Sequence, residues 1–223
     1  MKFLSRIILL LSKKVTRKNL DHLIKQNINN IDNKKKKILN IGAGGYIQDL
    51  LESIDNTEIT SIDIDLKRRP DILGDISSET VFTKIKIKPD VITCFEVLEH
   101  IKEPQKAINN LYKFSNKKTK LLFSVPFNFP IHDEPHDYYR YTKYGLEYLF
   151  KNFSNTQVIP RDGWLDTIFV FFIRLKFSKN YVLKILSIFM LIVYFVFLPL
   201  IDLIQKFLKF DKITTGYFII ANK

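Results

Sequence analysis

The chain has little cysteine, glycine or tryptophan: of its 223 residues, one is cysteine, seven are glycine and one is tryptophan. A single cysteine excludes an intramolecular disulfide and a cysteine-based zinc site. Because Cys94 ends an apolar stretch, we expect a small buried hydrophobic side chain there and not a nucleophile. The length allows one α/β domain with an elaboration, but not two independent domains.

Positive charge, in contrast, is abundant, with 35 Lys and Arg residues against 23 Asp and Glu residues and a net charge of +12. Such an excess favours an anionic partner, which could be nucleic acid, anionic lipid or a phosphate-bearing substrate. The basic runs Lys34–Lys37, Lys67–Arg69 and Lys117–Lys118 lie beside expected strand starts or turns. No aromatic-plus-basic stacking platform accompanies them. We therefore read these runs as solvated surface and expect no nucleic-acid partner.

Three of the few glycines stand close together, at positions 42, 44 and 45. They follow an apolar strand-like segment, Ile38–Ile41, and precede a helical pattern around Leu50. Glycine allows a sharp turn from strand to helix and a close approach of the backbone to a ligand. The pattern is typical of adenine-nucleotide sites, although a plain tight loop is the alternative.

Four further stretches are predicted as strands, 58–64, 71–76, 89–94 and 120–126, and residues 216–221 as a last one. Strands that alternate with helical segments predict a parallel sheet, whose ligands lie at the carboxyl ends of the strands. Asp63 is positioned there to bind ribose hydroxyls, with Asp65 as the competing candidate. The expected fold is α/β: a Rossmann-like, seven-stranded, mostly parallel sheet with helices on both faces and an apolar helical insertion before the last strand.

The ordered motifs resemble those of the class I S-adenosylmethionine-dependent methyltransferases, in the branch of type 11 and type 23 domains. Asn40–Gly45 is similar to the first motif, Ser61–Asp63 to the ribose-binding second, Gly74–Ile76 to the third, and Asp90–His100 to the fourth strand with its continuation. The resemblance implies S-adenosyl-L-methionine as the cofactor. It also implies these cofactor-binding residues: Asn40, Gly42, Ala43, Gly44, Asp63, Asp75, Phe95 and Glu96.

Two positions depart from the family pattern. Asn40 stands where an acidic residue is usual, so it offers a carbonyl oxygen without a charge, and Tyr46 stands where a further glycine is common. An NAD-binding oxidoreductase is one alternative, but Ile47 breaks its Gly-x-Gly-x-x-Gly fingerprint. A non-catalytic, membrane-associated scaffold with a degenerate cofactor site is the other.

The segment from Pro126 to Tyr144 contains three prolines and two histidines, and we expect a loop at the ligand-bearing edge of the sheet. Its pattern resembles a branch of these methyltransferases common among cell-surface glycan enzymes, in which it covers the cofactor and faces the acceptor. His132 and His136 are candidate general bases, and Asp137 is a candidate to orient one of them. The alternative is a structural loop in which Arg140 pairs with Asp137. No metal is expected, since no helical His spacing or Cys partner is present.

The stretch Ile185–Ile201 has no charged residue and is close to the minimum length of a transmembrane helix. A single crossing would, however, separate the last strand from its sheet. We therefore expect a helical insertion whose apolar faces lie in or on the cytoplasmic leaflet, kinked or ended at Pro199. Lysines at its edges would meet anionic head groups: Lys176, Lys179, Lys184, Lys206 and Lys209. A transmembrane helix at 185–201, a buried cap and a homodimer surface are the alternatives.

These observations predict three regions: a basic amphipathic helix region at 1–30, a cofactor-binding methyltransferase domain at 31–163 plus 212–223, and an apolar insertion at 164–211. The expected enzyme methylates a hydroxyl, or another nucleophile, of a small molecule, a glycan, a lipid-linked sugar or another amphiphile. Its expected place is cytoplasmic, peripheral at the inner face of a membrane.

Overall fold

The computed structural model describes residues 2–32 and 35–223, and the chain forms two compact units. We call the first the helical unit; it comprises Met1–Leu20, Phe127–His132 and Pro160–Gly216. The second, the sheet unit, comprises Asp21–Pro126, Asp133–Ile159 and Tyr217–Lys223.

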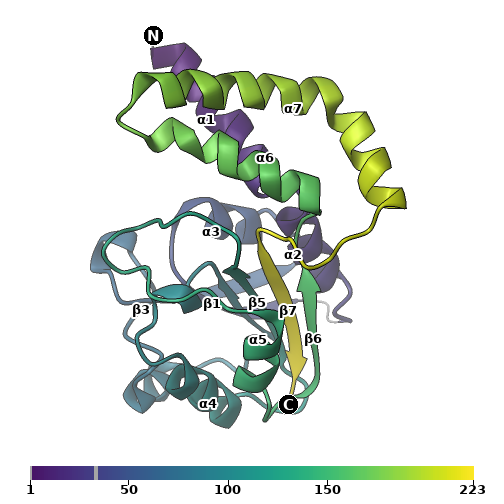
Figure 1. Cartoon of the computed structure of the whole chain (residues 1–223). Helices are drawn as coiled ribbons and strands as arrows, with labels where there is room; N and C mark the ends of the chain where they lie inside the picture. The colour runs from purple at the N-terminus through teal and green to yellow at the C-terminus, as the bar shows by residue number, and fades with distance from the viewer. Residues whose placement is uncertain (1, 33–34) are drawn as a thin grey trace. The chain divides into compact units, whose positions relative to one another are not determined.

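A seven-stranded sheet with the order β3-β2-β1-β4-β5-β7-β6 forms the centre of the sheet unit (Figure 1). Its strands are β1 Lys36–Ile41, β2 Thr57–Asp63, β3 Ile72–Leu73, β4 Val91–Phe95, β5 Lys120–Pro126, β6 Ser154–Pro160 and β7 Gly216–Asn222. β1 pairs in parallel with β2 and β4, as do β2 with β3 and β4 with β5. β7 runs opposite to β6 in Figure 1. The predicted fold class is confirmed.

The central strands form because their side chains are apolar on both faces, as expected for a parallel sheet covered by helices. Every residue of β4 is buried, and Leu121, Leu122 and Phe123 of β5 are fully buried. The helices of the unit are α2 Leu20–Asn29, α3 Gly45–Glu52, α4 Pro104–Phe114 and α5 Lys143–Leu149. Short 3₁₀ turns complete the connections: η1 Leu66–Arg68, η2 Glu79–Lys84 and η3 Leu98–His100.

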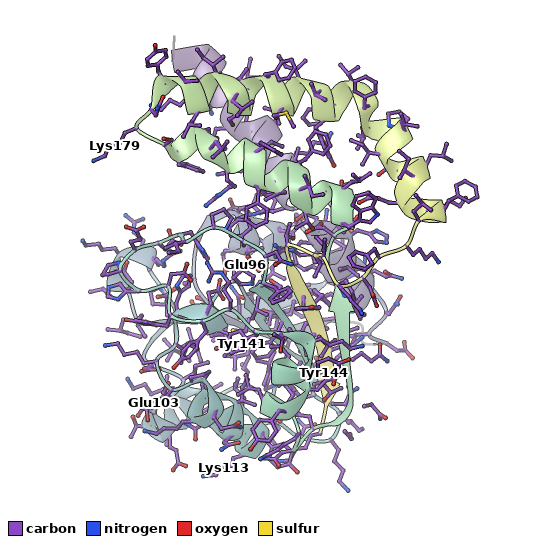
Figure 2. The ribbon with its side chains drawn as sticks, in the orientation of Figure 1. Glu96, Glu103, Lys113, Tyr141, Tyr144 and Lys179 are labelled. Carbon is purple, nitrogen blue, oxygen red and sulfur yellow. The ribbon has the colours of Figure 1, made fainter. Side chains whose placement is uncertain are left out.

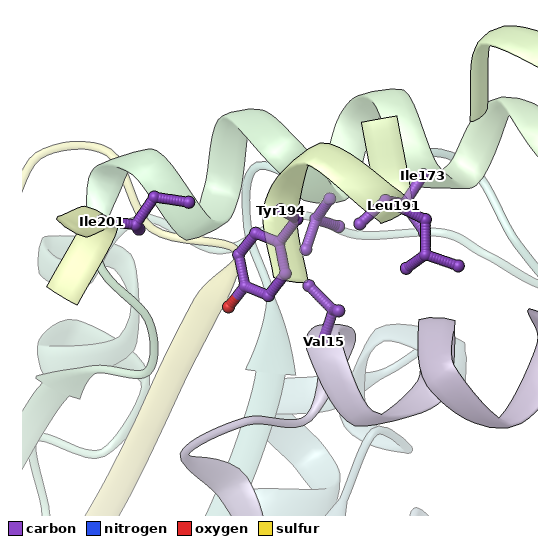
Figure 3. Packing of buried hydrophobic residues seen from close by; sticks show 6 residues of the cluster. Val15, Ile173, Leu191, Tyr194 and Ile201 are labelled. Carbon is purple, nitrogen blue, oxygen red and sulfur yellow. The ribbon is translucent and has the colours of Figure 1, made fainter. Parts of the chain in front are cut away.

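The helical unit contains α1 Lys2–Thr16, α6 Trp164–Arg174, the 3₁₀ turn η4 Leu175–Phe177 and the long helix α7 Tyr181–Phe207. Its core is a cluster of buried side chains (Figure 3): Val15, Val170, Ile173, Leu191, Tyr194 and Ile201. Within the basic amphipathic region expected at 1–30, the described residues form two helices, α1 and α2. Pro199 does not end α7, which continues to Phe207. Figure 1 shows the helix bending towards its C-terminal end, as a proline inside a helix produces.

A buried carboxylate joins α6, α7 and the turn that follows α1. Asp166, whose side chain is 2% exposed, accepts hydrogen bonds from Tyr194 Oη at 2.7 Å and Gln205 Nε2 at 3.0 Å. Lys18 Nζ lies 3.2 Å from the same carboxylate and also contacts Asp202. These two acids raise the pKa of Lys18, against the effect of its burial. Because a buried charge is tolerated only when it is paired, this network fixes α6, α7 and the turn that follows α1 to one another.

Candidate cofactor and acceptor site

The turn after β1 can be built only with glycine. Gly42 has φ 97° and Gly44 has φ 69°, a region that other residues rarely adopt. A Cβ on Gly42 would lie 2.7 Å from Val97 Cγ2, so the loop after β4 leaves no room for a side chain. The Gly42 amide also donates to Ile62 O at 2.8 Å, which holds the turn against β2.

Asp63, the last residue of β2, faces this turn. One carboxylate oxygen accepts from the Ala43 amide at 2.8 Å and the other from the Asp65 amide at 2.8 Å. Asp65 instead caps η1 by accepting from the Lys67 amide at 2.9 Å. Of the two candidates for the ribose, the structure therefore places Asp63, and not Asp65, beside the glycine loop.

Asn40 lies beneath the same loop and is fully buried. Its side-chain nitrogen donates to Gly42 O at 2.7 Å and to Gln48 Oε1 at 2.8 Å, and its oxygen accepts from Thr93 Oγ1 at 2.9 Å. An amide suits this position because it donates and accepts at once, whereas a carboxylate only accepts. Asn40 thus orders the loop from below, and its carbonyl oxygen is already used within the protein.

The ends of the neighbouring strands supply the remaining candidates. Asp75 is exposed, and its carboxylate accepts from the Ser77 amide at 2.8 Å, which fixes the turn after β3. Phe95 is buried and stacks on Phe218, with ring centroids 5.9 Å apart, so it belongs to the core.

Glu96 follows Phe95 with φ 54°, a strained conformation for a residue other than glycine. Ser124 holds it in place, accepting from the Glu96 amide at 3.0 Å and donating to Glu96 Oε1 at 2.8 Å. Figure 2 labels Glu96 and, in the loop that follows β5, Tyr141.

The loop after β5 contains two hydrogen-bonded pairs of side chains. His136 Nδ1 lies 2.9 Å from Tyr138 Oη, and His100 Nδ1 lies 2.8 Å from His136 O. Asp137 forms a two-pronged ion pair with Arg140, at 2.5 and 2.6 Å. The pKa of the Arg140 guanidinium is raised, and the hydrogen bonds to Asp137 are the largest cause. In this structure Asp137 therefore orients Arg140, while His136 has the Tyr138 hydroxyl as its side-chain partner.

The two candidate bases belong to different units. His132 lies in the helical unit, where its ring meets Phe129 edge-on with centroids 5.6 Å apart. His136 lies in the sheet unit. Sequence reasoning did not link Tyr138 to His136 and missed the contact between their side chains. A histidine and a tyrosine two positions apart give no helical or strand signal for such a contact.

Arg68 was also missed as a site residue, since it lies in a basic run that we read as solvated surface. Its Nη1 donates to Ala43 O at 3.4 Å, and its Nε lies 3.9 Å from Asp63 Oδ2. The guanidinium thus contacts both partners of the Asp63–Ala43 bond. The fold brings Arg68 next to Ala43, and the spacing of the two residues in the sequence does not predict this contact.

Comparison with known proteins identifies the family. Residues 15–159 match the model of a methyltransferase domain family (Methyltransf_23). The chain belongs to this family. It is also 30% identical over 129 residues to a ubiquinone biosynthesis O-methyltransferase of Coxiella burnetii (strain RSA 493 / Nine Mile phase I). That match covers 52% of each chain, so the chain spans about half the length of the curated relative that it matches.

Solved methyltransferase structures share the fold. An S-adenosylmethionine-dependent methyltransferase from Archaeoglobus fulgidus superposes with a TM-score of 0.57 at 13% identity, covering 93% of this chain and 97% of that one. Phosphoethanolamine N-methyltransferase 2 of Haemonchus contortus, in complex with S-adenosyl-L-methionine, gives 0.56 at 14% identity, covering 92% and 52%. The cofactor of the family is S-adenosyl-L-methionine. Family membership decides against the dehydrogenase alternative.

The residues present fit this cofactor. The glycine turn at Gly42 and Gly44 carries no Cβ where a ligand must approach the backbone, and the Asp63 carboxylate stands beside it. Ile64 follows with 73% of its surface exposed, which leaves an apolar side chain next to the acid. An adenosine group needs such a combination of backbone, acid and apolar surface.

Proposed function

We propose that this protein transfers a methyl group from S-adenosyl-L-methionine to a hydroxyl, or another nucleophile, of an amphiphilic acceptor such as a glycan or a lipid-linked sugar. The observation that carries methyl transfer is the Asp63–Ala43 contact at the glycine turn, in a chain of this family. The O-methyltransferase named among the relatives favours a hydroxyl acceptor.

In this proposal the chain's own residues bind, align and deprotonate. Bound in the site, S-adenosyl-L-methionine supplies an electrophilic methyl group on a sulfonium sulfur. Gly42 and Gly44 would admit it, Asp63 would hold its ribose hydroxyls, and Asp75 would hold its adenine amino group. Displacement at the methyl carbon requires alignment of the acceptor, and a hydroxyl must also lose its proton. We assign that proton to His136, received directly or through Tyr138 Oη, with His132 as the competing base.

A membrane surface is the proposed place of work. Among the described residues, α7 is the one helix long and apolar enough to cross a bilayer. Only 22% of its most apolar 18-residue stretch is buried. Its large exposed side chains include Val182, Ile185, Phe189, Ile192, Val196, Phe197, Leu200 and Leu203. The helical unit also carries fourteen Lys and Arg residues against four Asp residues and no Glu. Apolar surface combined with positive charge is characteristic of helices that lie in an anionic leaflet.

The order of the sheet supports this placement over a single crossing. α7 is preceded by β6 and followed by β7, and these strands are neighbours in one sheet. The segment between β6 and β7 must therefore begin and end on the same side of a bilayer, so a crossing by α7 would need a second span in the same segment. α6, with 11 residues, is too short to provide a second span. We therefore propose a cytoplasmic enzyme with α7 lying in the inner leaflet.

Two measurements test the proposal. Calorimetric titration of the purified protein with S-adenosylhomocysteine should show binding, and tight binding of NAD in its place would contradict the activity. Cell fractionation should recover the protein with membranes, partly resistant to high salt. Its C-terminus should be protected from protease added outside the cell. An accessible C-terminus would contradict the in-leaflet placement.

The competing function is a soluble enzyme whose exposed α7 face forms a homodimer. The apolar area on α7 is also what such an interface would need. Light scattering after chromatography without detergent separates the two: a soluble dimer of the whole protein would rule out the membrane placement.

A further inference from the structure

The Asp63 carboxylate is a nearly buried charge at the glycine turn. Its side chain is 11% exposed, and its oxygens accept from the amides of Ala43 and Asp65, each at 2.8 Å. A carboxylate removed from water is costly unless a positive charge compensates it. Among the described residues, Arg68 is the one cationic side chain within 4.0 Å of this carboxylate, with its Nε 3.9 Å from Asp63 Oδ2. Arg68 therefore provides the positive charge that this acid needs.

The distance between Arg68 and Asp63 leaves the acid free to bind a ligand. At 3.9 Å the contact is an ion pair and not a hydrogen bond, so it occupies no acceptor position. A carboxylate offers about four acceptor positions, and the amides of Ala43 and Asp65 use two of them. The remaining positions match the pair of hydroxyls on the ribose of a nucleoside.

The glycine turn and the 3₁₀ turn η1 together hold the Arg68 guanidinium in place. Its Nη1 donates to Ala43 O at 3.4 Å. A Cβ on Gly44 would lie 3.4 Å from Arg68 O and 3.9 Å from Arg68 Cβ, so η1 packs closely against the glycine turn. The Arg68 amide donates to Asp65 O at 3.1 Å, and the Asp65 amide donates to the Asp63 carboxylate. The same short segment thus supplies the acid and its cation and places both against the turn.

The next residue, Arg69, provides a comparison. Both arginines are exposed, and both line an open pocket of about 410 Å³ that residues of α3 and β2 complete. Within the described part of the chain, the Arg69 side chain makes no ion pair or hydrogen bond with the glycine turn or with Asp63. Contact with the acid therefore distinguishes Arg68 from Arg69, whereas charge and access to solvent do not.

We propose that Arg68 is a positioning residue for the cofactor. Its charge stabilises the Asp63 carboxylate beside the glycine turn, and its distance from that carboxylate leaves the free acceptor positions to the ribose hydroxyls. This inference rests on the proposed function, in which Asp63 holds the ribose. Arg68 acts through Asp63 and takes no part in the methyl transfer step. The competing role is a plug, in which Arg68 occupies the place of the ribose and must leave before the cofactor binds.

The first experiment compares the affinity for S-adenosylhomocysteine in variants of the full chain by calorimetric titration. Arg68→Gln should weaken binding about three- to tenfold, because solvent screens part of the attraction of a half-exposed charge. Arg68→Lys should recover part of this loss, since lysine keeps the charge but not the fork that reaches both Asp63 and Ala43. Arg69→Gln is the matched control and should change the affinity less than about twofold.

Two outcomes of this titration would overturn the proposal. Equal losses of affinity in Arg68→Gln and Arg69→Gln would show diffuse attraction without a specific role for Arg68. Tighter binding in Arg68→Gln than in wild type would show that Arg68 is a plug.

A double-mutant cycle with Asp63→Asn tests whether Arg68 acts through the acid. Asparagine keeps the size of the side chain and removes its charge. In the Asp63→Asn background, Arg68→Gln should therefore change the affinity less than about twofold. The full loss in that background would show that Arg68 acts only through Ala43 or through the fold, and would overturn the proposal.

Salt provides an independent readout of the charge on Arg68. Raising the concentration of sodium chloride should weaken the binding of S-adenosylhomocysteine more in wild type than in Arg68→Gln, because salt screens an exposed ion pair. Equal salt dependence in the two proteins would contradict an electrostatic role.

Failure of this inference and failure of the proposed function give different results. Wild-type protein that binds no S-adenosylhomocysteine contradicts the proposed function. An affinity that is the same in wild type and Arg68→Gln overturns the positioning role alone. Unfolding midpoints in denaturant should be close to the wild-type value in Arg68→Gln, Arg68→Lys and Arg69→Gln, which verifies that the variants are folded.

Discussion

The carboxylate of Asp63 accepts a hydrogen bond from the backbone amide of Ala43 at 2.8 Å, across 20 positions of sequence. The last residue of one strand thus holds the loop that follows its neighbour. A loop held in this way pays little conformational entropy when a ligand binds. The same carboxylate that would accept from the ribose is therefore also the group that shapes the glycine turn.

Replacing Asp63 with Ala should weaken S-adenosylhomocysteine binding by about ten- to hundredfold, taking hydrogen bonds to a charged group as ~1.5–3 kcal/mol. Asp65→Ala is the matched control, since Asp65 caps η1, and it should change affinity no more than a few-fold. Calorimetric titration measures both. Equal losses of affinity in the two variants would contradict the assignment of the ribose to Asp63.

Replacing Gly42 with Ala should destabilise the protein for two separable reasons. The new Cβ meets Val97 at 2.7 Å, and φ stays at 97°. Strained backbone costs about 1–3 kcal/mol and overpacking a similar amount. Adding Val97→Ala should restore only the packing part. Denaturant unfolding measures both variants, and a stability of Gly42→Ala equal to wild type would contradict the close contact.

Replacing His136 with Ala should lower turnover on the acceptor and leave S-adenosylhomocysteine affinity within a few-fold. Tyr138→Phe should also lower turnover if the proton passes through the hydroxyl, because the 2.9 Å contact between Tyr138 Oη and His136 Nδ1 is then lost. His132→Ala tests the competing base. Full activity in a variant lacking both histidines would leave alignment as the main source of catalysis.

Burial, and after it the charges of Arg174 and Lys13, lowers the pKa of Lys176 to about 8, and this shift has a defined sign for stability. Between pH 8 and the ordinary lysine value of 10.5, the unfolded chain keeps the Lys176 proton that the folded chain has released. Stability should therefore rise with pH in this interval. Lys176→Met should remove this contribution, as measured by unfolding midpoints at pH 7.5 and 9.5. Because the group is only half-buried, solvent screening keeps the effect small.

Much of the sheet could be predicted from sequence because its central strands are uninterrupted apolar runs. β6 was expected only as part of a seven-stranded total, since among its seven residues only Val158 is buried and its pattern is not that of a core strand. Pro199 is tolerated inside α7, although proline more often ends a helix. The local sequence does not show whether α7 continues past Pro199, because this depends on packing of the helix as well as on the backbone hydrogen bond that proline removes.

The candidate site was predicted by residue type more successfully than by contact. Asp63 and Asp65 both follow apolar residues of one strand, and only the paired strands show which carboxylate meets the glycine loop. For Asp137, the alternative in which it pairs with Arg140 is the contact that the structure contains, whereas its proposed catalytic role remains a prediction. Contacts between loops depend on tertiary packing, which spacing along the chain does not encode.

The position of β7 has a consequence for how the protein is made. β7 follows α7 in the chain but lies between β5 and β6 in the sheet. During synthesis the apolar helix therefore leaves the ribosome while β5 and β6 still have unpaired edges, which are prone to aggregation. Early contact of α7 with a lipid surface would shelter the nascent chain through that interval, so membrane supply should govern the yield of folded protein in cell-free translation.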